Sequence, residues 1–62
     1  MKIIVFSMSD GAILRNVECP ADSAEIQCGD GEWFVEHEPV DDEAFKVDVA
    51  TLALVPIGGA GA

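Results

Sequence analysis

The side chains most capable of chemistry in this 62-residue sequence are two cysteines and one histidine. Cys19 and Cys28 lack the Cys-x-x-Cys spacing of zinc and redox sites, and His37 alone does not complete a convincing zinc site with them. Without a secretion signal, we expect two reduced, small core residues, although a disulfide between them would close a short loop. Glu36 and Glu38 could tune His37 as a general base, but its alternating segment favours an ordinary strand residue.

Two further segments have the composition of binding loops but not the spacing. Gly29-Asp30-Gly31-Glu32 is glycine-rich, yet its glycines are wrongly spaced for a phosphate loop, and no Lys, Ser or Thr follows. Asp41-Asp42-Glu43 could gather a calcium ion with Glu38 or Asp48, but no EF-hand spacing exists. No Ser-His-Asp grouping has a supporting motif either. We therefore predict a non-enzymatic protein with no catalytic residues, no metal and no cofactor.

Charge and hydropathy restrict the class of partner. The chain carries twelve Asp or Glu against three Lys or Arg, for a formal net charge of -9, and half of its residues are apolar. Its basic residues are scattered singly, whereas phosphate binders cluster them, so we expect neither nucleic acid nor an anionic membrane as partner. No apolar stretch approaches the length of a membrane span, and the N-terminal apolar run is too short for a signal peptide. We expect synthesis in a cytoplasm.

Period-two alternation of apolar residues dominates the chain and predicts an all-β fold. Lys2 to Met8 and Ala12 to Cys19 flank the turn signal Ser9-Asp10-Gly11, which predicts a first β-hairpin. Pro20 to Ser23 predicts a loop or short turn, because proline cannot donate to a strand ladder.

The same signals predict two further hairpins. Ala24 to Cys28 and Glu32 to Glu38 alternate on either side of Gly29-Asp30-Gly31. Beyond an acidic connector, Ala44 to Val49 alternates most clearly, and Leu52 to Pro56 follows as a last short strand. The sequence thus predicts a small antiparallel meander of about five or six short strands in three hairpin-like units, closing as an open sheet or a small barrel.

Residues 1–56 are predicted to form one small β domain, and residues 57–62 a Gly/Ala tail that is flexible or threaded into a partner. A chain of this size buries only about 60% of its unfolded surface and usually needs a disulfide, a metal or a partner. Continuous apolar runs such as Ile3-Ile4-Val5-Phe6 are typical of strands buried on both faces. We expect a 62-residue monomer to be too small to cover both faces, which favours a partner protein or a homo-oligomer.

The consecutive aromatic residues Trp33 and Phe34 should point to opposite faces of a strand. Either the same small fold covers both faces, or only one of them fills the core and the other is exposed or buried in a partner. The candidate partner-binding residues are Trp33, Phe34, Ile57, Gly58 and Gly59.

The strand and turn motifs also follow one another in a familiar order. They are Met1-Lys2-Ile3, Asp10-Gly11-Ala12-Ile13-Leu14-Arg15, Cys19-Pro20, Ile26-Gln27-Cys28-Gly29-Asp30-Gly31-Glu32, Val35-Glu36, Asp41-Asp42, Val47-Asp48 and Leu54-Val55-Pro56. In this order the chain resembles small tail-fibre-associated and tail assembly proteins of tailed bacteriophages. The resemblance covers nearly the whole chain and implies a structural role in the virion. It departs from the pattern at Thr51-Leu52, where a glycine is expected, and at Cys28, where a small or apolar residue is usual.

Two functions from different classes are therefore expected. The first is a virion structural protein, made in the host cytoplasm, that docks on tail, fibre, baseplate or capsid proteins through its sheet faces or edges. The second is a small acidic phage inhibitor that occupies a basic, nucleic-acid-binding site on a host protein. In the second case the functional residues would be the acidic ones, Glu36, Glu38, Asp41, Asp42 and Glu43.

Overall fold

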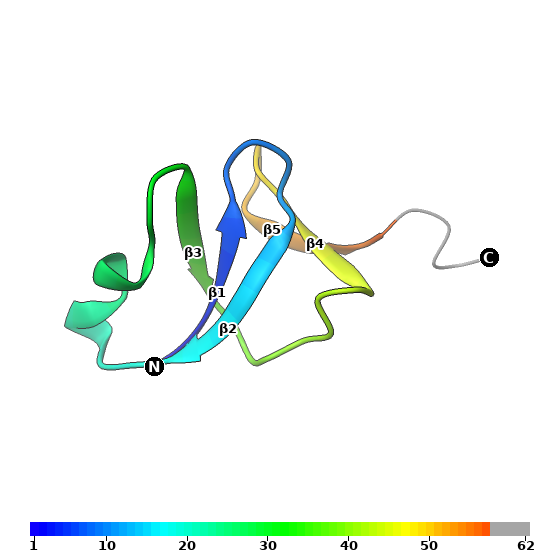
Figure 1. The fold of residues 1–62 in the computed structure, drawn as a ribbon. Coiled ribbons are helices and arrows are strands. Elements are labelled where there is room, and N and C mark those ends of the chain that lie inside the picture. The colour runs from blue at the N-terminus through cyan, green and yellow to red at the C-terminus, as the bar shows by residue number, and fades with distance from the viewer. Residues whose placement is uncertain (58–62) are drawn as a thin grey trace.

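The computed structural model describes residues 1–57, which form two antiparallel sheets joined by short connections (Figure 1). The three-stranded sheet has the order β2-β1-β3, and its strands are β1 (Lys2–Ser7), β2 (Ile13–Glu18) and β3 (Glu32–Glu36). The two-stranded sheet consists of β4 (Phe45–Asp48) and β5 (Ala53–Pro56). Two 3-10 helices connect β2 to β3, namely η1 (Ala21–Ser23) and η2 (Glu25–Gln27). The predicted all-β fold of open antiparallel sheets is confirmed.

The β1–β2 hairpin forms where the sequence predicts it, around the Asp10-Gly11 turn. Gly11 has a positive φ of 80°, and its N–H donates to the carbonyl oxygen of Ser7 at 2.7 Å. The side chain of Asp10 accepts the N–H of Ala12 at 3.0 Å. A Cβ atom on Gly11 would overlap the carbonyl oxygen of Val47, so glycine allows this turn to lie directly against β4.

The second predicted hairpin is wrong in its first strand. Residues 24–28 form the turn of η2 rather than a strand, and β3 pairs with β1, with Phe34 opposite Val5. The alternating apolar residues of this segment do not share one buried face, because Ala24 is 2% exposed whereas Ile26 is 77% exposed. Pro20 lies at the entrance of η1, and its carbonyl oxygen accepts the N–H of Ser23 at 2.9 Å.

The β4–β5 hairpin confirms the third predicted unit, with Val47 opposite Leu54. Its turn is organised by Asp48, whose carbonyl oxygen accepts the N–H of Leu52 and whose side chain accepts the N–H of Ala50 at 2.9 Å. Leu52 has a positive φ of 61°, at the turn where the sequence lacks an expected glycine. Leucine therefore occupies a backbone conformation that glycine adopts without steric strain.

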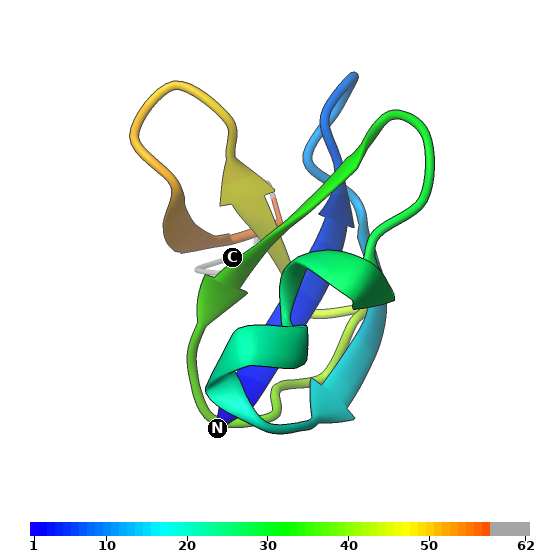
Figure 2. The same ribbon diagram turned by 90° about the vertical axis from the view of Figure 1, so that its left-hand side faces the viewer.

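One face of the three-stranded sheet is covered by the β4–β5 hairpin (Figures 1 and 2). Ile4 and Phe6 of β1 pack there with Ile13 of β2 and Val47 of β4. Partly buried residues complete this cluster, namely Val35, Val40, Phe45 and Leu54.

The opposite face is covered by the segment that contains η1 and η2, which lies in front of the sheet in Figure 2. Ile3 and Val5 of β1 pack there against Ala24. The surrounding half-buried residues are Val17, Cys19, Cys28 and Phe34. The chain thus covers both faces of β1 by itself, and Ile3, Ile4, Val5 and Phe6 are at most 1% exposed. The expectation that a chain of this size is too small to cover both faces of such a strand is wrong, because a short hairpin and a pair of 3-10 turns suffice.

The acidic connector between β3 and β4 is irregular, as predicted, and is attached to the sheet by one side chain. Asn16 of β2 donates through Nδ2 to the carbonyl oxygen of Val40 at 3.1 Å and accepts the N–H of Val40 at 3.2 Å. The carboxylates of the segment Asp41-Asp42-Glu43 are exposed. This pair of hydrogen bonds holds Val40 over the core while its acidic neighbours remain in water.

Candidate protein-binding edge

Strand β3 lies at an edge of the three-stranded sheet, and no other strand of residues 1–57 pairs with its outer side. The N–H of His37 donates to the carbonyl oxygen of Lys2, so the odd-numbered residues of β3 exchange their backbone hydrogen bonds with β1. The backbone N–H and C=O groups of Phe34 and Glu36 therefore point outward. Such an edge is a template on which another extended chain can add as a strand.

Trp33 and Phe34 border this open edge. The centroids of their rings are 4.9 Å apart, and the ring planes are inclined by 37°. Phe34 also packs on the cluster that contains Val5, whereas Trp33 remains 37% exposed. Consecutive strand residues project to opposite faces, and β1 fills the inner side of β3, so we infer that the two rings meet around its outer side. The structure thus brings the two predicted contact residues together and leaves Trp33 accessible.

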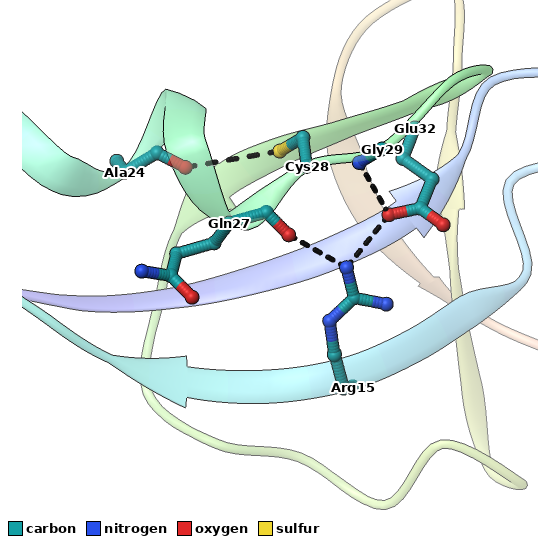
Figure 3. A network of polar contacts seen from close by, with 6 residues as sticks. All are labelled: Arg15, Ala24, Gln27, Cys28, Gly29 and Glu32. Atoms are coloured by element: carbon teal, nitrogen blue, oxygen red, sulfur yellow. Dashed lines mark hydrogen bonds and ion pairs between the residues drawn. The ribbon is translucent and has the colours of Figure 1, made fainter.

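A polar network fixes the start of β3 (Figure 3). Oε1 of Glu32 accepts hydrogen bonds from Nη2 of Arg15 at 2.7 Å and from the N–H of Gly29 at 2.8 Å. Arg15 also donates to the carbonyl oxygen of Gln27 at 2.6 Å. The hydrogen bond from Gly29, followed by that from Arg15, lowers the pKa of Glu32 below its usual value. Sequence reasoning missed this network, because nothing in the local pattern pairs Arg15 with Glu32.

The other end of β3 is more acidic and more open. Glu36 is exposed, and Glu38 forms an exposed ion pair with Lys2 at 3.2 Å. Nδ1 of His37 lies 2.8 Å from the carbonyl oxygen of Glu38. These four residues line an open hollow of about 310 Å³. The imidazole of His37 thus contacts the backbone rather than a neighbouring carboxylate, as expected of an ordinary surface residue.

Cys19 and Cys28 are free thiols that lie half-buried against the cluster of Ile3, Val5 and Ala24. Sγ of Cys28 donates to the carbonyl oxygen of Ala24 at 3.8 Å (Figure 3). Burial raises the pKa of the Cys28 thiol, and the nearby Glu32 carboxylate raises it further. Cys28 is therefore a protonated packing residue at neutral pH rather than an activated nucleophile.

The remaining candidate residues do not join this edge. Ile57 is 40% exposed and continues the β4–β5 pairing, since its N–H donates to the carbonyl oxygen of Ala44 at 3.0 Å. Gly58 and Gly59 lie outside the described residues. Within residues 1–57, no group of three or more metal-binding side chains comes together, and neither helical segment is long and apolar enough to cross a membrane.

Comparison of the chain with protein-family models, with curated proteins and with solved structures gives no match. The case for a functional site therefore rests on the geometry of β3, on the aromatic pair beside it and on the carboxylates at its end.

Proposed function

We propose that this protein is a non-enzymatic assembly protein that binds other proteins through the open edge of β3. The observation that carries the proposal is an edge strand whose outer side pairs with no strand of residues 1–57 and which has an exposed tryptophan beside it. Strand addition supplies main-chain hydrogen bonds. An aromatic side chain that becomes buried on binding, as we propose for Trp33, supplies much of the affinity at many interfaces. The proposed partner-binding residues are Trp33 and Phe34.

The proposed setting is the virion of a tailed bacteriophage. The order of turn and strand motifs supports this setting through its resemblance to tail-fibre-associated and tail assembly proteins. In that setting the protein is made in the host cytoplasm and docks on tail, fibre, baseplate or capsid proteins. It is present as a homo-oligomer or in several copies.

A second candidate function, inhibition of a nucleic-acid-binding host protein, is favoured by the charge distribution. Lys2 and Arg15 each form an ion pair with one glutamate, and the chain has only one further basic residue. Most of its twelve carboxylates therefore have no basic partner within ion-pair distance in residues 1–57. Such a surface would attract a basic groove in a salt-dependent manner.

Mass spectrometry of purified particles of the encoding phage tests the proposed function. We expect the protein in the particles, and we expect Trp33→Ala to lower its amount by about tenfold or more, because Trp33 anchors the interface. The matched control is Ile26→Ala, which removes the most exposed large apolar side chain from a segment on one face of the sheet. Thermal unfolding of both variants confirms that they fold.

Two results would contradict the proposal. Absence of the protein from particles rules out the virion role, and salt-sensitive capture of a basic host protein then supports the inhibitor. Equal incorporation of Trp33→Ala and wild type rules out Trp33 as an anchor.

A further inference from the structure

We infer that the occupant of the β3 edge is an extended segment of another protein that carries a basic residue opposite Glu36 and an apolar residue opposite Phe34. This inference rests on the proposed function and specifies the chemistry of the partner. It follows from three features of the edge, which are its hydrogen-bonding pattern, its charge and its unsuitability for a second copy of the chain.

The hydrogen-bonding pattern sets the length and the register of the partner. Phe34 and Glu36 are two residues apart on β3, and their outward N–H and C=O groups are spaced by about 7 Å. A partner strand of about five residues can exchange backbone hydrogen bonds with both positions. Side chains of the partner that lie opposite Phe34 and Glu36 then project to the same face of the extended sheet.

The charge of the edge is not uniform along β3. At its start, the carboxylate of Glu32 is already paired with Arg15 at 2.7 Å, so this end offers no free charge. At its end, Glu36 is exposed and is followed by Glu38, whose pairing with Lys2 is exposed to solvent and therefore weak. Charge complementarity places a Lys or Arg at the end near Glu36 and an uncharged residue at the end near Glu32.

A second copy of this chain is a poor occupant. Antiparallel pairing of two β3 strands about Phe34 places Glu36 of each copy opposite Glu32 of the other, so the exposed Glu36 carboxylate meets an acidic residue that is already paired with Arg15 and gains no basic partner. Each copy also carries a net charge of -9, which opposes association. An extended segment with one basic residue satisfies the same backbone groups and also pairs with the exposed carboxylate of Glu36.

Selection from a displayed library of random nine-residue peptides against the full-length protein tests this chemistry. We expect the selected peptides to be enriched in Lys or Arg two positions from an apolar residue. In antiparallel addition the basic residue comes first, so the order of the two positions also reports the strand direction. Selection against Glu36→Lys, an exposed position, should replace the basic residue by Asp or Glu.

A selected peptide, once synthesised, tests whether binding is by strand addition. Trp33 is the single tryptophan of the chain, so its fluorescence reports binding directly. N-methylation of the peptide at the amides that face β3 should weaken binding by about tenfold or more, because a hydrogen bond is removed and a methyl group collides with the strand. N-methylation at the alternate amides, which point away, is the matched control and should leave the affinity unchanged.

The inference and the proposed function fail in different ways. If the library yields no enriched sequence, or if basic enrichment survives Glu36→Lys, then the partner chemistry is wrong, although particle incorporation that depends on Trp33 would still support the proposed function. Equal affinity of the two N-methylated peptides overturns strand addition. A dimer in sedimentation that dissociates on Trp33→Ala assigns the edge to a second copy and overturns the basic occupant.

Discussion

Two glycines of this protein adopt the same backbone conformation in very different surroundings. Gly11 and Gly31 have φ values of 80° and 75°. A Cβ atom on Gly11 would overlap the carbonyl oxygen of Val47, whereas one on Gly31 would have no atom within 4 Å. Gly31 is therefore needed only for its positive φ. Gly11 is needed for its positive φ and also because the β1–β2 turn leaves no space for a side chain beside β4.

Alanine substitution should separate these two requirements. We expect Gly31→Ala to lower the free energy of unfolding by about 1 kcal/mol, the cost of a left-handed non-glycine residue. Gly11→Ala should cost at least about 3 kcal/mol, because β4 must also move away from the turn. Urea denaturation of both variants gives the comparison, and equal costs would contradict a steric role for Gly11.

Leu52 presents the opposite situation, a bulky residue where glycine fits better. We expect Leu52→Gly to raise the free energy of unfolding by about 1 kcal/mol, because relief of the left-handed strain exceeds the loss of a side chain that is 44% exposed. In a domain of this size, that gain corresponds to a rise in Tm of about 4–8 °C. Val49→Gly in the same turn is the control and should lower Tm, since Val49 does not have a positive φ. A lower Tm for Leu52→Gly would show that packing of this side chain outweighs the strain.

At the scale of elements, one arginine–glutamate contact joins three parts of the fold. Arg15 lies on β2, Glu32 begins β3, and Gln27 ends η2, so their hydrogen bonds fasten the 3-10 segment to the sheet. This contact helps to hold one cover of the sheet in place, in addition to the apolar contacts of Ala24.

The lowered pKa of Glu32 makes this contribution pH-dependent. The folded-state pKa lies below the unfolded value of about 4.5, so the contribution is complete above that pH and is lost as the pH falls through the folded-state pKa. The difference in free energy of unfolding between wild type and Glu32→Gln should therefore be constant near pH 7 and should shrink below about pH 4.5.

Urea denaturation between pH 7 and pH 3, a range that spans the usual pKa values of carboxyl groups, measures this difference. Glu18→Gln removes one negative charge from the far end of β2 and controls for the change in net charge. A difference between wild type and Glu32→Gln that does not vary over the acid range would contradict the role of Glu32.

Elements defined by local signals could be predicted from the sequence, and those defined by distant contacts could not. The Asp10-Gly11 turn signal predicts the first hairpin, and the clear alternation from Ala44 onward predicts the third. Residues 24–28 alternate equally well but form a 3-10 turn instead of pairing with β3, and this turn places Ala24 against Ile3 and Val5 of β1, a contact that the local alternation does not indicate. The aromatic pair beside the open edge was predicted by residue type, whereas the contact between its rings and the role of Arg15 depend on strand order.

At the scale of the whole molecule, a chain with few residues available for a core uses one strand, β1, in two small hydrophobic clusters. β1 contributes Ile4 and Phe6 to one cluster and Ile3 and Val5 to the other. The apolar run of this strand predicts burial on both faces, with the second face covered by a partner. Because the chain supplies both covers, the case for a partner now rests on the open edge of β3 and not on uncovered faces.

The placement of the shared strand also has a consequence for biosynthesis. β1 leaves the ribosome first, but Phe6 packs against Val47, which is made roughly 2–8 s later at ordinary elongation rates. During that interval, the segment Ile3-Ile4-Val5-Phe6 is a short, uncharged run of β-branched and aromatic residues, a composition that favours aggregation. This strand therefore lacks its β4 cover until β4 has been made, and we expect co-expressed chaperones to raise the yield of folded protein.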